Sequence, residues 1–167
     1  MVEKTLDRRW MLRGAGAAGA AMVGGIALAG AAPANERGST DMRRNSVEGS
    51  WLIEHQDDPA ADNPAVRAVA SFAAGGVYTG IDIAPPSPAQ AGSWESTGAG
   101  AFRATFWTGD AGPAGSGAPA VVVRVRPRGR VNGDRISGTY RVQVWDAATG
   151  TVLQSGTGRF WGTRIEA

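Results

Sequence analysis

From residue 49 onward, the chain consists of short runs in which apolar and polar residues alternate, separated by Gly, Pro, Asn and Asp. Such alternation predicts β-strands with one buried face, because successive side chains of a strand point to opposite sides. Only residues 63–71 compete as a helix, and their amphipathic period is weak. Eight strands are therefore expected, at residues 49–55, 66–72, 77–82, 92–96, 101–108, 121–131, 135–145 and 151–165.

The two faces of these strands predict how they assemble. Trp51, Ile53 and His55 share one side of the first expected strand. The same rule groups Phe102, Ala104 and Phe106 in the fifth strand and Tyr140, Val142 and Val144 in the seventh, opposite polar residues. One apolar and one polar face is typical of an antiparallel sheet. Since no helix is available to cover the apolar face, the predicted fold is all-β, a single antiparallel, roughly eight-stranded up-and-down β-barrel.

The segments between the expected strands predict tight turns and two longer loops. Ala74-Gly75-Gly76 and Asn132-Gly133-Asp134 favour hairpins, because glycine and asparagine accept the left-handed conformation of tight turns. Three prolines interrupt residues 83–91, and residues 109–119 are rich in Gly, Ala and Pro. Both segments are long enough to form a mouth or lid over a barrel interior.

Composition limits the available chemistry. The 167 residues fit one folded domain, and they include no cysteine and a single histidine, His55. The lack of cysteine excludes disulfides, thiolate zinc sites, iron–sulfur clusters and a cysteine nucleophile. The 25 glycines and 9 prolines follow no Gly-X-Y period, which excludes a collagen-like chain.

The first 34 residues have the order of a removable export signal. A polar start with Arg8 and Arg9 is followed by residues 14–32, which carry no charge and are mostly Ala and Gly. This run is too weakly apolar to favour a stable membrane span, and Ala32-Pro33-Ala34 offers small residues for cleavage. Polar residues 35–48 predict a flexible tether that leads into a barrel domain at residues 49–167.

The segment from Asp7 to Arg13 resembles the twin-arginine translocation signal. Arg8, Arg9, Met11, Leu12 and Arg13 match its pattern, whereas Asp7 stands where the family usually has Ser or Thr. The resemblance implies export of the folded protein to the periplasm or the exterior of a bacterium, with the twin-arginine translocon and signal peptidase as partners. An ordinary general-secretory signal is the alternative.

Removal of the signal changes the charge balance. Of 17 basic and 15 acidic residues, 4 and 2 lie within the first 34, which leaves 13 of each. A neutral balance gives no electrostatic reason to expect binding to nucleic acid or to an anionic membrane surface.

A tripeptide and an arginine far apart in the sequence carry a further resemblance. Gly49-Ser50-Trp51 resembles the G-x-W motif of the lipocalins and the wider calycin group, and Arg164 stands where those families pack an arginine across the tryptophan. This implies a tryptophan that plugs one barrel end beneath a guanidinium group. Residues 137–144 (SGTYRVQV) and 155–163 (SGTGRFWGT) are also similar to the closing strands of allene-oxide-cyclase-type barrels.

Three functions stay open for such a barrel. The leading interpretation is the binding of one small apolar ligand in the interior. The second is an enzyme of the cyclase or isomerase type that acts on a hydrophobic polyketide, terpenoid or lipid-like substrate, and the third is a filled barrel that works through its surface. The expected lining residues are Trp51, Ile53, Phe72, Phe102, Phe106, Tyr140 and Phe160.

Candidate catalytic residues are few. His55 is the side chain whose ordinary pKa lies nearest neutrality, and Tyr140 could orient a ligand or donate a proton. A histidine at a strand end without a partner nearby in the sequence is more often half exposed and without a chemical role. Glu54 and His55 fall on opposite faces of their strand, and no calcium-loop spacing is present. No metal site and no cofactor are predicted.

Overall fold

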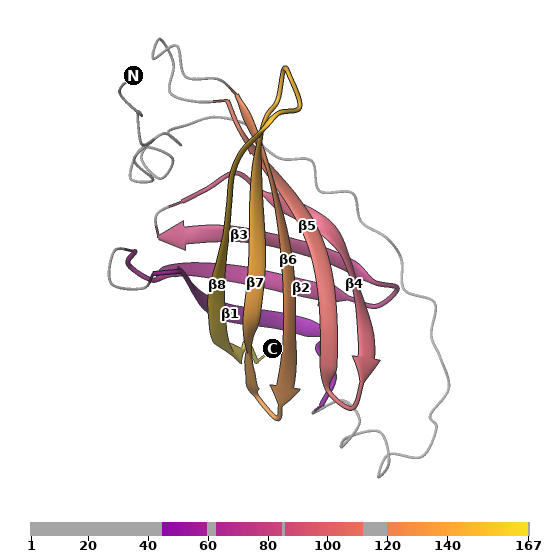
Figure 1. Cartoon of the computed structure of the whole chain (residues 1–167). Helices are drawn as coiled ribbons and strands as arrows, with labels where there is room; N and C mark the ends of the chain where they lie inside the picture. Colours follow the sequence, from indigo (N-terminus) through magenta and orange to yellow (C-terminus); the bar gives the residue numbers. More distant parts are fainter. Residues whose placement is uncertain (1–44, 60–62, 85, 112–119, 167) are drawn as a thin grey trace, which may run out of the picture.

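The alternating pattern is realised as eight strands joined in chain order (Figure 1). A computed structural model describes residues 45–59, 63–84, 86–111 and 120–166. Each strand pairs antiparallel with the next, and the last pairs with the first, so the predicted all-β, up-and-down barrel is confirmed. The strands are β1 (Gly49–Asp57), β2 (Val66–Ala73), β3 (Val77–Ala84), β4 (Gln90–Gly98), β5 (Ala101–Asp110), β6 (Val121–Asn132), β7 (Arg135–Asp146) and β8 (Val152–Arg164).

Two groups of strands cross one another in this barrel. Figure 1 shows β1, β2 and β3 running across the view, while β5, β6, β7 and β8 run up and down. The ladder between β3 and β4 has only four paired positions, from Val77 opposite Ser93 to Gly80 opposite Gln90. The barrel wall is therefore held by the fewest backbone pairs between these two strands.

Residues 66–71, part of the segment that competes as a helix, lie in β2, where alternate side chains face the interior. Val66, Ala68 and Ala70 are buried, whereas Arg67 is exposed. Burial of every second residue matches a strand period and not a helical one. No helix suited by length and hydropathy to cross a membrane occurs in the described part of the chain.

Trp51 fills one end of the barrel. Its side chain has no exposed surface, and the indole Nε1 donates a hydrogen bond of 2.8 Å to the carbonyl of Val47. The guanidinium carbon of Arg164 lies 4.2 Å from the centre of the Trp51 ring, which is the contact implied by the lipocalin resemblance. A cation over an indole face is attracted by the ring quadrupole, so this contact links β1 to β8.

Residues 46–48 fall in the expected tether but pack against this end of the barrel. Val47 is 4 % exposed. Arg164 donates from Nη1 to the carbonyl of Glu48 at 2.6 Å and from Nη2 to the carbonyl of Ser46 at 2.7 Å. The packed part of the domain thus begins before Gly49, because this short segment buries an apolar side chain and supplies two acceptors. The predicted signal peptide and residues 35–44 lie outside the described residues.

The largest difference in strand bounds concerns β4. It was expected at residues 92–96 but runs from Gln90 to Gly98, so part of the predicted loop at 83–91 belongs to strands. β3 likewise continues to Ala84. These extensions bring Asp82 and Gln90 into the barrel wall, and both side chains are buried.

Candidate functional site

A cavity of about 240 Å³ occupies the barrel interior beyond the packed end. Trp51, Val131 and Ile136 fill that end and do not border the space. Its lining is mostly apolar and comes from the inward faces of the strands: Ile53, Ala68, Ala70, Phe72, Phe102, Phe106, Val123, Val125, Val142, Val144 and Phe160. A cavity of this kind suits a small apolar molecule, since it removes the ligand's hydrocarbon surface from water.

One side of the cavity carries a chain of polar side chains from β1, β3 and β4. The hydroxyl of Tyr78 donates to Oε1 of Gln90 at 3.0 Å, and Nε2 of Gln90 donates to Oδ1 of Asp82 at 3.1 Å. The same Asp82 oxygen lies 3.1 Å from Nε2 of His55. We call these four residues the polar wall. Its members meet where the ladder between β3 and β4 ends.

A second hydrogen-bonded pair lies next to the polar wall. The hydroxyl of Tyr140 on β7 donates to Oδ1 of Asp57 on β1 at 2.7 Å. The rings of His55 and Tyr140 meet edge to face, with their centres 6.1 Å apart. His55 and Tyr140, the two predicted catalytic candidates, therefore border the same space.

Two glycines leave room for the tyrosine hydroxyls. A Cβ atom at Gly80 would lie 2.6 Å from the hydroxyl oxygen of Tyr78 and 2.9 Å from Oε1 of Gln90. A Cβ atom at Gly158 would lie 2.3 Å from the hydroxyl oxygen of Tyr140. Because real Cβ atoms do not approach so closely, any side chain at these positions would displace the tyrosines and break their hydrogen bonds.

Tyr78 acts in the polar wall as a hydrogen-bond donor. Burial raises the pKa of its hydroxyl far above the ordinary value of a tyrosine, and the charge of Asp82 raises this pKa further. The hydroxyl therefore keeps its proton at neutral pH and donates a hydrogen bond to Gln90. An amide oriented in this way presents its NH₂ group to Asp82.

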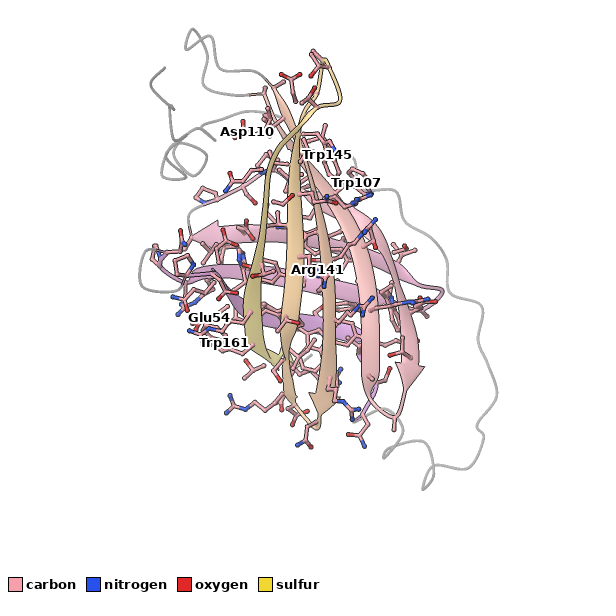
Figure 2. All side chains as sticks on the ribbon, viewed as in Figure 1. Glu54, Trp107, Asp110, Arg141, Trp145 and Trp161 are labelled. Atoms are coloured by element: carbon pink, nitrogen blue, oxygen red, sulfur yellow. The ribbon has the colours of Figure 1, made fainter. Side chains whose placement is uncertain are left out.

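The predicted lining residues lie around the cavity with one exception. Ile53, Phe72, Phe102, Phe106, Tyr140 and Phe160 border it, as does His55. Trp51 does not, because its ring is enclosed by the packed end. Glu54 lies on the outside, where it accepts hydrogen bonds from Trp161 at 2.9 Å and Arg67 at 3.1 Å (Figure 2).

Three residues of the site were missed by reasoning from the sequence: Tyr78, Asp82 and Gln90. Alternation from Tyr78 through Gly80 places Asp82 on the same face, so a signal for Asp82 was present. Gln90 gave none, since it follows the prolines of an expected loop. In the described ranges, no three His, Cys, Asp or Glu side chains are grouped so that they could hold a metal ion.

Comparison with known proteins adds no assignment to this geometry. No protein-family model, no curated protein sequence and no solved structure matches the chain. A function must therefore be inferred from the cavity and its chemistry.

Proposed function

We propose that this chain is an exported β-barrel protein that binds one small apolar ligand in its interior. The observation that carries this proposal is the cavity of about 240 Å³ with its largely apolar lining. Interiors of eight-stranded barrels are wide enough to hold one small ligand. The contact between Trp51 and Arg164 supports kinship with lipocalin-like barrels. A filled barrel that works only through its surface is disfavoured, because such a barrel would leave no space of this size.

Export is supported by the sequence of the first 34 residues. Their order of paired arginines, weakly apolar run and small residues favours the twin-arginine route and cleavage by signal peptidase. The mature protein would then act in the periplasm or outside the cell.

We expect a bound apolar ligand to raise the melting temperature by several degrees. A ligand that binds only the folded state at about 100 times its Kd stabilises that state by about 2.7 kcal/mol. The measurement is differential scanning calorimetry with a panel of lipids, polyketides and terpenoids. Tryptophan emission is a poor readout, because no tryptophan of the described residues borders the cavity and Trp107 and Trp145 stack on the outside (Figure 2).

A pair of variants locates the binding site. Ala68→Leu adds volume inside the cavity and should abolish the ligand-induced rise in melting temperature. Ala73→Leu, at the exposed end of the same strand, should leave the rise unchanged. A panel that leaves the melting temperature of the unaltered protein constant would contradict interior binding.

A barrel enzyme of the cyclase or isomerase type is the second candidate. The observation that favours it is the 3.1 Å contact between His55 and Asp82 at the cavity surface. A carboxylate that accepts a hydrogen bond from an imidazole fixes the orientation of the ring, so His55 could transfer a proton to or from a hydrophobic substrate. The Tyr140 ring, 6.1 Å away, adds a second polar group to that space.

The substitution His55→Gln separates binding from catalysis. For a binding protein, we expect the affinity for the ligand to change by no more than about 0.5–1.5 kcal/mol, the net contribution of one hydrogen bond. Proton-transfer catalysis would instead lose about a hundredfold or more in kcat with little change in affinity. Isothermal titration and turnover assays on the same compound distinguish the two results. The second one would replace ligand binding by catalysis as the principal function.

A further inference from the structure

The polar wall has used its principal donors internally. The Tyr78 hydroxyl donates a hydrogen bond to Gln90, and the Gln90 amide donates one to Asp82. A carboxylate only accepts, so His55 must donate from Nε2 to Asp82. The Tyr140 hydroxyl is likewise committed to Asp57.

In the polar wall, mainly acceptors remain for a ligand. Both hydrogen bonds that reach the Asp82 carboxylate from the polar wall end on Oδ1, which leaves the lone pairs of Oδ2 for another donor. A neutral imidazole that donates from Nε2 carries an acceptor lone pair on Nδ1. Asp57, which already accepts a hydrogen bond from Tyr140, adds a second negative charge to the lining. A polar ligand group that donates hydrogen bonds is therefore bound more favourably here than one that only accepts them.

The charges around the cavity favour the same sign of ligand. Asp57 and Asp82 border it, whereas none of its described lining residues is Lys or Arg. The barrel arginines point elsewhere; Arg67, Arg103 and Arg141, for example, have exposed side chains. A ligand carboxylate would meet two protein carboxylates in a space of low polarity, where like charges repel strongly.

We propose that the ligand of this cavity is a hydrophobic amine. Its apolar body lies against the aromatic floor formed by Phe72, Phe102 and Phe160, and its ammonium group donates to Asp82 and His55. A buried ammonium must be paired and hydrogen-bonded to offset its loss of hydration, and the polar wall meets both conditions. This inference rests on the proposed binding function and names the ligand class for the same site.

The test compares ligands that share one hydrocarbon body: 2-phenylethylamine, ethylbenzene and 3-phenylpropanoate. Isothermal titration at neutral pH should give an amine affinity at least about tenfold higher than that of ethylbenzene, as one charge-assisted hydrogen bond provides. The carboxylate should bind more weakly than ethylbenzene. If ethylbenzene binds and the amine binds no more tightly, the inference is overturned while the proposed function stands. If none of the three binds and no compound of the apolar panel does, the proposed function fails and this inference fails with it.

Substitutions then assign the preference to the polar wall. Asp82→Asn keeps the size of the side chain but removes its charge, so the amine should lose about tenfold in affinity while ethylbenzene is unaffected. Glu95→Gln removes an equal charge from the exposed outer face of β4 and should change neither affinity. If Asp82→Asn does not fold, His55→Leu removes the other proposed acceptor of the ammonium group and should likewise reduce the preference for the amine over ethylbenzene. An unchanged preference for the amine in the folded variant would overturn the inference.

Discussion

Trp51→Ala should lower the free energy of unfolding by about 3–5 kcal/mol, the range found when a large buried aromatic is truncated. Three losses combine at this position. The packed end of the barrel gains a void, Val47 loses its hydrogen-bond donor at 2.8 Å, and Arg164 loses the ring beneath its guanidinium group. Denaturant unfolding followed by circular dichroism measures the change.

Trp161→Ala is the matched control for this substitution. Trp161 is 36 % exposed on the outer face of β8 and makes one hydrogen bond to Glu54. We expect its removal to cost about 1 kcal/mol or less. A loss of similar size in both variants would show that Trp51 does not act as the plug of the barrel end.

Replacement of both Arg8 and Arg9 by lysine should keep the protein in the cytoplasm. The twin-arginine signal, which this segment resembles, is defined by the arginine pair itself, so lysines that preserve the charge do not replace it. Fractionation of cells, with detection of the precursor and the cleaved form, measures the effect.

Arg13→Lys serves as the control for export, because it preserves the arginine pair as well as the charge. Export should continue in this variant. Continued export of the Arg8→Lys, Arg9→Lys double variant would instead identify a general-secretory signal, whose n-region requires only positive charge.

The barrel could be predicted because its strands obey a local rule. Along β5, Phe102 and Ala104 are buried and Arg103 is exposed. The alternation within a strand's own sequence thus indicates which of its side chains face the interior. Closure followed from the lack of helices to cover that face. The aromatic lining of the cavity was predictable for the same reason.

The polar wall was less accessible to such reasoning. His55 and Asp82 are 27 positions apart, and their contact depends on the register of β1, β2 and β3. Gln90 enters the site because β4 begins earlier than its prolines suggested. The prediction that Trp51 lines the cavity was wrong, because alternation gives the face on which a side chain lies but not whether its neighbours enclose it.

The pairing of β1 with β8 also constrains how the protein is made. Trp51 on β1 lies opposite Arg164 on β8. The edge of β1 that pairs with β8 therefore has no partner until the end of the chain has been synthesised. Contacts between distant segments slow folding, and an unpaired strand edge invites pairing with other chains. Until β8 is available for pairing, the open edge of β1 in the nascent chain therefore needs protection from aggregation.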